Sequence, residues 1–281
     1  MIVNSIRNGD GKQVVFTSMA DVIANMADRK GRYRANGDDA WTGAQSLGHA
    51  VTMLRDGWTE GRQIVDGVIG SLESDLQQVA HDMVQDMVHD VAGAYPDMGL
   101  YMEGEPECMV QFVTANPDTT SGQVTRLLVD NGANANHTAQ WMTKRAGAIA
   151  ALVHVLGMVG KSVEVWVASP VDIHGKMHDT VVRVHEAGTP VNIDSIAFAL
   201  GHPAMLRRIM FECRYDDTLG YGWAGAHNGK HIQETLDYVQ PHVVVGRVEN
   251  EPKHIPNPVD APLEWVRYQL AQLGLLETVD A

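Results

Sequence analysis

VTRLLVD, at positions 124–130, begins the stretch of sequence that decides the fold. It is a short apolar run typical of a buried strand, and a loop of small residues, NGANAN (131–136), follows it. From Thr138 to Gly157 the chain is almost entirely apolar, which predicts a helix that is covered on most sides. Later runs predict three more strands and a closing amphipathic helix: Val163–Ala168, Thr180–His185, Val243–Val248 and Pro262–Leu273. Strands that alternate with helices predict a three-layer, Rossmann-like α/β fold with a parallel-rich sheet.

The first third of the chain reads as helical. Ser18 and Ser46 resemble helix N-caps, and Gly57 is typical of a helix end. From Glu60 to Val91, apolar residues recur every three or four positions, which predicts a long helix with acidic residues on its other face, interrupted near Gly67 and Gly70. We therefore divide the chain into a mainly helical N-terminal region with an acidic arm, residues 1–105, and an α/β core, residues 106–281. The exposed apolar seam, from Val65 to Met87, predicts self-association into a homo-oligomer.

The formal net charge of −14 is unevenly distributed along the 281 residues. Twelve acidic residues and one arginine lie between Asp56 and Glu107, so this segment carries −11 and the rest of the chain −3. This balance excludes a protein that coats DNA through a general excess of Lys and Arg, but it allows a local basic groove. Two cysteines exclude a disulfide scaffold, and we expect both to be inert core thiols. The polar N-terminus and the short apolar runs predict a cytoplasmic protein with no membrane contact.

One dense basic run reverses the charge locally. It contains Arg29, Lys30, Arg32, Tyr33 and Arg34. Cations at this spacing follow a phosphate backbone, and an interleaved aromatic ring offers bases a surface for stacking. The alternative is a solvated helix end, because cations suit a helix C-terminus.

A second group of candidate nucleic-acid contacts lies in the last third of the chain. Arg207, Arg208 and Arg214 form a weaker basic cluster, and Tyr221, Trp223 and Lys230 lie in or near a glycine-rich loop. Gly220-x-Gly222-x-x-Gly225 matches a dinucleotide fingerprint by letter, but a polar turn precedes it where that motif needs a strand. We expect the loop aromatics to stack on unpaired bases; the alternative is that Trp223 packs on the core.

Asp130-x-Gly132-x-Asn134 resembles the metal loop of von Willebrand factor A domains, which has the form D-x-S-x-S. The resemblance implies a von Willebrand factor A-like core. Both serines are absent, and Mg²⁺ prefers several oxygen ligands, so we interpret the loop as a degenerate, metal-free site. His174 and His178 have metal-like spacing only if they lie on a helix, and we attribute the pair to chance. Because no catalytic motif is present, we predict a protein that is not an enzyme and has no cofactor.

Several stretches resemble a family of phage proteins: Trp41-Thr42-Gly43, Gly57-Trp58-x-Glu60-Gly61, Glu105 to Met109, the Asp130 loop, and Phe198 to Arg208. Within such proteins, the length and the acidic bias are similar to the single-stranded-DNA-binding proteins of schitoviruses. That resemblance implies single-stranded DNA and a phage RNA polymerase as partners, a role in replication, and residence in the host cytoplasm. The alternatives are a protein-interaction adaptor and an enzyme with an unrecognised metal site.

Overall fold

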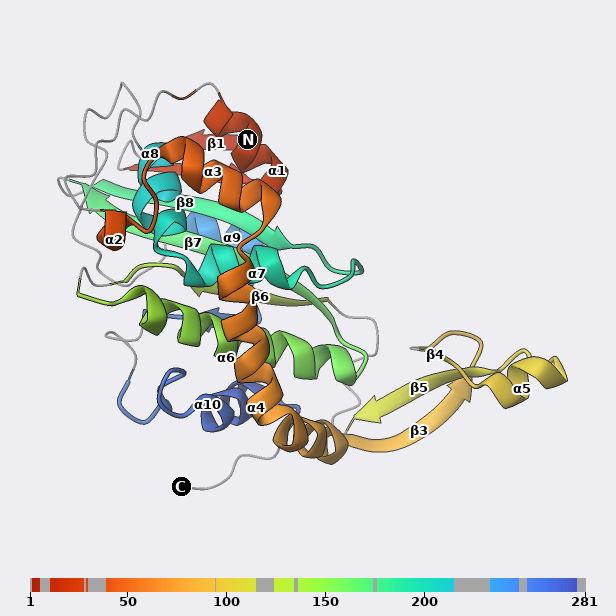
Figure 1. Cartoon of the computed structure of the whole chain (residues 1–281). Helices are drawn as coiled ribbons and strands as arrows, with labels where there is room; N and C mark the ends of the chain where they lie inside the picture. The colour runs from red at the N-terminus through yellow and green to blue at the C-terminus, as the bar shows by residue number, and fades with distance from the viewer. Residues whose placement is uncertain are drawn as a thin grey trace.

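Strand β6 (Val124–Asp130) is the VTRLLVD run, and it pairs on both sides (Figure 1). The computed structural model describes residues 2–5, 11–27, 29, 39–93, 95–114, 124–133, 136–173, 176–214, 233–247 and 252–276. β6 is parallel to both of its neighbours, β7 (Ser162–Ile173) and β9 (Val243–Val245). This arrangement brings the carboxyl ends of three strands to one edge of the sheet.

The main sheet has six described strands in the order β1-β2-β8-β7-β6-β9. β8 (Lys176–His185) is antiparallel to β7 and parallel to β2 (Gly11–Phe16), while β1 (Ile2–Ser5) is antiparallel to β2. The sheet is therefore mixed. The first two strands were not predicted, and their pairing joins the N-terminal part of the chain to the α/β sheet. The division of the chain at residue 105 stays a prediction.

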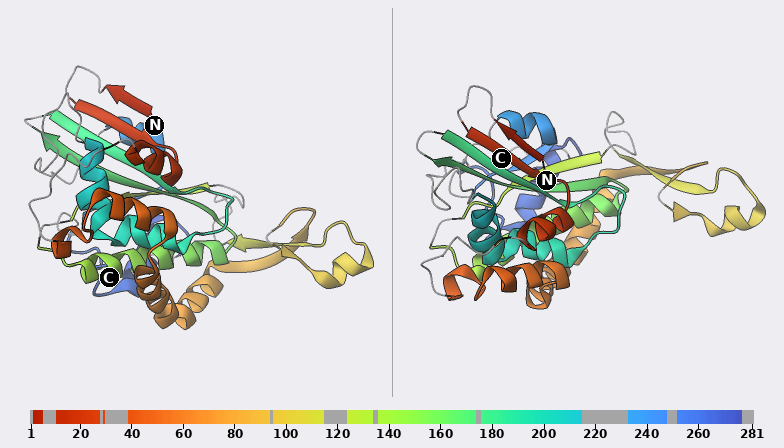
Figure 2. Two further views of the ribbon diagram at one scale, coloured as in Figure 1. Left: turned by 45° about the horizontal axis from the view of Figure 1, so that its top comes forward. Right: turned by 90° about the horizontal axis from the view of Figure 1, so that it is seen from above.

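Helices cover both faces of the sheet, which confirms an α/β architecture (Figure 2). α6 (Ala139–Met158) lies on one face with α7 (Ile193–Gly201), α1 (Met19–Ala27), α3 (Leu47–Asp56) and α4 (Thr59–Met83), and α10 (Pro262–Gln272) packs against α6. The main hydrophobic core lies between these helices and the sheet. α9 (Gln233–Val239) lies on the other face, over a smaller cluster that includes Leu128, Trp166 and Val181.

Two predicted helix starts are confirmed. Ser18 Oγ accepts a hydrogen bond from Asp21 N (3.1 Å) ahead of α1, and Ser46 Oγ accepts one from His49 N (3.1 Å) at the start of α3. α3 ends as predicted at Gly57, whose φ of 97° lies in the region that favours glycine.

The prediction for Glu60 to Val91 is wrong in two respects, because α4 continues without a break through Gly67 and Gly70 and the second part of the range is not helical. α4 ends at Met83, and the chain passes directly into β3 (Val84–Asp90). The apolar seam of α4 is covered within the chain, because Val65, Leu76 and Val79 are buried and α4 packs on α6 and α7. α4 and α6 approach each other closely at Gly147 of α6, where an added Cβ would lie 2.9 Å from Val68 Cβ of α4. The seam therefore gives no reason for self-association, and the oligomeric state stays a prediction.

Residues 84–114 form a projection that we call the arm (Figures 1 and 2). β3 pairs with β5 (Met109–Thr114), which pairs in turn with the short β4 (Tyr95–Pro96), and both pairings are antiparallel. Between β4 and β5 lies α5 (Met98–Glu103). The acidic arm of the sequence thus exists, but it is mostly a small sheet rather than a continuation of the helix.

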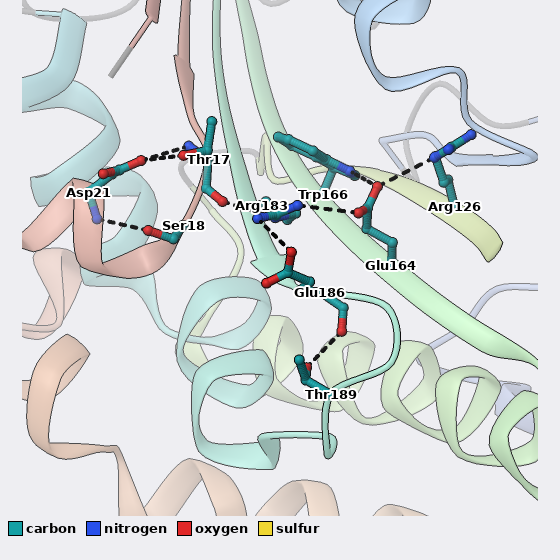
Figure 3. Close-up of polar contacts among 9 residues, drawn as sticks. All are labelled: Thr17, Ser18, Asp21, Arg126, Glu164, Trp166, Arg183, Glu186 and Thr189. Carbon is teal, nitrogen blue, oxygen red and sulfur yellow. Dashed lines mark hydrogen bonds and ion pairs between the residues drawn. The ribbon is translucent and has the colours of Figure 1, made fainter.

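A charged network fastens the sheet at the edge opposite the carboxyl ends of β6 and β7 (Figure 3). Glu164 lies between Arg126 (3.5 Å) and Arg183 (3.6 Å) on the neighbouring strands, and it accepts a hydrogen bond from Trp166 Nε1 (2.7 Å). Arg183 Nε also donates to the main-chain oxygen of Thr17 (2.9 Å), just after β2. Three neighbouring strands and the residue that follows β2 are thereby connected through one carboxylate and two guanidinium groups.

Among the described helices, none has both the length and the apolar character that crossing a membrane requires.

Candidate nucleic-acid interface

The carboxyl ends of β6, β7 and β9 form the edge at which open α/β sheets usually bind ligands. The loop after β6 leads here into α6, whose N-cap, Thr138, accepts a hydrogen bond from Trp141 N (3.2 Å). We call this edge, with the loops and helix ends beside it, the carboxyl edge.

The Asp130 loop is held by its own polar side chains. Asp130 is fully buried, and its Oδ1 accepts a hydrogen bond from Gly132 N (2.7 Å). Asn131 Nδ2 donates to the main-chain oxygen of Ala199 (3.1 Å) in α7. These contacts shape the loop and fix it to the neighbouring helix.

A buried arginine lies next to this loop. Arg145, in α6, donates from Nη1 to the main-chain oxygen of Asp130 (3.0 Å) and from Nη2 to that of Gly246 (2.8 Å). One guanidinium thus connects the ends of β6 and β9. A divalent ion does not fit these residues, because Gly132 supplies no ligand, Asp130 Oδ1 is engaged, and a cation is already adjacent. Within the described residues, no group of three or more His, Cys, Asp or Glu has an arrangement able to hold a metal ion.

Arg207 has a structural position rather than the exposed position that a phosphate contact needs. It lies in the π-helix η2 (Met205–Met210), and only 2% of its surface is exposed. Its Nη1 donates to the main-chain oxygen of Trp41 (2.6 Å) in α2 (Asp39–Thr42), and its Nη2 donates to that of His137 (3.1 Å). Burial lowers the pKa of Arg207.

Arg208 is also directed into the protein. It donates from Nε and Nη2 to the main-chain oxygen of Ala44 (3.2 and 2.9 Å) and from Nη2 to Thr42 Oγ1 (3.1 Å). Its Nη2 also lies 3.9 Å from Asp39 Oδ1. Both arginines of this pair thus anchor the segment around α2, and we leave them out of the proposed interface.

Three half-buried aromatic side chains lie at this edge. The rings of His137 and Trp141 stack with centroids 3.7 Å apart and an interplanar angle of 14°. Arg207 Cζ lies 4.6 Å from the centre of the Trp41 ring. Sequence reasoning missed these residues, although the spacing of four between His137 and Trp141 at a helix start was an available signal.

Arg29 is the member of the basic run that the structure describes. It donates from Nε to Asn25 Oδ1 (3.0 Å) and from Nη1 to the main-chain oxygen of Glu212 in α8 (Phe211–Arg214). The end of α1, where the basic run begins, therefore adjoins the end of α8, where the glycine-rich segment begins.

The other predicted contacts lie outside the described residues: Lys30, Arg32, Tyr33, Arg34, Tyr221, Trp223 and Lys230. The backbone of Arg214 ends α8, but its side chain is also outside them. The same holds for Asn134, for the Gly220–Gly225 motif and for His174. His178 is buried in β8, so the helix that a metal pair would need is not present at that position.

Comparison with known proteins yields a family but no activity. No curated protein and no solved structure matches the chain. One family model, described as Domain of unknown function (DUF7192), matches residues 8–277, which is nearly the whole chain. The protein with this buried Asp130 loop and carboxyl edge therefore belongs to the DUF7192 family.

Proposed function

We propose that the protein binds single-stranded nucleic acid at the carboxyl edge, without catalysis. The observation that carries the proposal is the hydrogen bond from Arg29 to Glu212, because it brings the starts of the two candidate binding segments together. The basic run supplies cations, and the glycine-rich segment supplies Tyr221, Trp223 and Lys230.

The aromatic side chains at the same edge support this proposal. η2 and α8 form one continuous helical segment. Arg207 of this segment donates hydrogen bonds to the main-chain oxygens of Trp41 and His137, and the main-chain oxygen of Glu212 accepts one from Arg29. Half-buried rings next to cationic segments are typical of surfaces that stack unpaired bases. The net charge of −14 favours a confined site over general coating of DNA.

The resemblance to phage proteins extends the proposal. In this view the core is a degenerate von Willebrand factor A-like domain, and the protein acts like the schitovirus single-stranded-DNA-binding protein Drc. It would then support replication and bring a phage RNA polymerase to unpaired DNA in the host cytoplasm.

Titration of a fluorescent oligo(dT) against the matched duplex, followed by anisotropy, tests the proposal. We expect tighter binding of the single strand and a loss of affinity with salt. Trp141→Ala is expected to weaken binding about tenfold if its ring stacks on a base. Tyr238→Ala is the matched control, because Tyr238 is 41% exposed on the opposite face of the sheet.

A second variant separates charge from stacking. Replacing Lys30, Arg32 and Arg34 by Ala is expected to weaken binding and to flatten its salt dependence. The proposal fails if both variants melt like the wild-type protein and bind the oligonucleotide with unchanged affinity.

A further inference from the structure

The arm exposes an unusual amount of apolar surface. Of the ten large hydrophobic side chains that are exposed among the described residues, six lie between residues 88 and 102: Val88, Val91, Tyr95, Met98, Tyr101 and Met102. Apolar residues grouped in this way on a protein surface mark sites of interaction with other molecules.

Three of these side chains share one face of a helix. Met98, Tyr101 and Met102 are 60%, 60% and 78% exposed, and their spacing of i, i+3 and i+4 puts them side by side on α5. This is the spacing of the anchors with which an amphipathic helix binds an apolar groove.

The framework of the arm holds this face in place. Asp97 Oδ1 caps α5 by accepting hydrogen bonds from Gly99 N (2.9 Å) and Leu100 N (3.3 Å), and Gly104 ends the helix with a φ of 80°. His89 Nε2 on β3 lies 3.2 Å from Asp97 Oδ2, which connects the helix to the sheet of the arm. The apolar face is therefore presented on a fixed support.

Charge decides which partner suits this face. Residues 84–114 contain six acidic residues and no Lys or Arg, so nucleic acid is repelled from the arm. The remainder of the chain carries a net charge of −8, which makes a second copy a poor electrostatic match. Glu103, Glu105 and Glu107 are exposed beside the end of α5 and form an acidic rim.

We propose that the arm docks through Met98, Tyr101 and Met102 onto an apolar surface of another protein that is rimmed by Lys and Arg. The methionines suit this role because their flexible side chains adapt to the partner surface. The acidic rim adds attraction and orientation. This interaction is separate from the nucleic-acid interface, so either proposal can fail without the other.

Methyl NMR of the full-length protein labelled at its methionines tests the proposal. The probe is a synthetic amphipathic helix of Leu and Lys, which is the smallest surface with the required chemistry. We expect saturable shifts of the Met98 and Met102 signals and no shift of Met53 or Met158, which are half-buried on α3 and α6. A peptide with Glu in place of Lys is the matched control and is expected to leave all four signals unchanged.

Two sets of substitutions separate the apolar and the charged contributions. Replacing Met98 and Met102 by Asp is expected to weaken binding of the peptide by about tenfold or more, since two large apolar contacts are lost. Replacing Glu103, Glu105 and Glu107 by Gln is expected to weaken it several-fold and to reduce its dependence on salt.

Three results would overturn the proposal. The first is the absence of shifts at Met98 and Met102, or equal shifts at all methionines. The second is unchanged peptide affinity in both sets of variants. The third is a dimer in sedimentation that becomes monomeric when Met98 and Met102 are replaced by Asp, because a second copy would then occupy the face.

Discussion

Arg145 Nη1 donates a 3.0 Å hydrogen bond to the main-chain oxygen of Asp130, so a buried guanidinium is fixed to the end of β6. The same guanidinium reaches Gly246 after β9, which makes it a connection between two neighbouring strand ends. Arg145 therefore holds the Asp130 loop against the end of β9.

Replacing Arg145 by Met is expected to lower the free energy of unfolding by about 2–4 kcal/mol, because the main-chain oxygens of Asp130 and Gly246 then lose their hydrogen-bond donors. Urea denaturation measures the change. Lys144→Met is the matched control, since Lys144 precedes Arg145 on the same helix and is exposed, and its effect is expected to stay within about 0.5 kcal/mol. Equal effects of the two changes would contradict a structural role for Arg145.

Adding Mg²⁺ or a chelator is expected to leave the melting temperature and the affinity for oligo(dT) unchanged. The reason is that the residues of the Asp130 loop do not fit a divalent ion while Arg145 is present. Differential scanning calorimetry with and without Mg²⁺ tests this. A rise in melting temperature that increases with Mg²⁺ concentration would show that the folded protein binds the ion.

His202 is expected to make the fold less stable in mild acid. Burial lowers the pKa of this residue to about 4, and the charge of His49 adds to the effect. In the unfolded chain the pKa is about 6.5, so the unfolded state binds the proton first as the pH falls. The stability that neutral His202 contributes is therefore present above pH 6.5 and is lost as the pH falls from 6.5 to 4. Between pH 7 and 5, the free energy of unfolding is expected to fall by about 2 kcal/mol.

The variant His202→Asn isolates this contribution. Asn can still accept the hydrogen bond that Ala204 N donates to His202 Nδ1 (3.1 Å), but it does not titrate. We expect the free energy of unfolding to fall less in this variant than in the wild-type protein between pH 7 and 5. Parallel pH profiles for the two proteins would show that another group is responsible.

Replacing two glycines of α6 by alanine is expected to change the free energy of unfolding in opposite directions. At Gly147 a Cβ would meet Val68 Cβ at 2.9 Å, so Gly147→Ala is expected to cost about 1–3 kcal/mol by forcing α4 away from α6. At Gly157 a Cβ would meet no atom within 4 Å, so Gly157→Ala is expected to stabilise the protein by about 0.5–1 kcal/mol. Chemical denaturation of both variants measures the pair, and destabilisation by both changes would point to a general effect of alanine in this helix.

The strands and helices that sequence predicted well are those with local signals. β6 has the predicted bounds, Val124–Asp130, and α6 begins one residue after the predicted start of the helix, Thr138. In both, the apolar pattern and the residues at the ends agree with the packing that the fold imposes.

The predictions were wrong where the structure depends on contacts between residues that are far apart in the sequence. The spacing of Met83 and Met87 continues a helical pattern, but residues 84–90 form a strand whose partners in β5 lie 19 to 30 residues later. β2 depends in the same way on β8, and Arg207 and Arg208 look like exposed cations in sequence but donate to main-chain oxygens more than 160 residues earlier. No local pattern contains that information.

Because α4 continues directly into β3, the direction in which the arm projects depends on the rotation of the helix at its last residue. α4 is fixed against α6, and no loop separates Met83 from Val84 to absorb a change of angle. Each residue inserted near the end of α4 turns whatever follows by about 100° and moves it by about 1.5 Å. A single insertion would thus aim the arm at a different side of the molecule while every residue of its surface stayed the same.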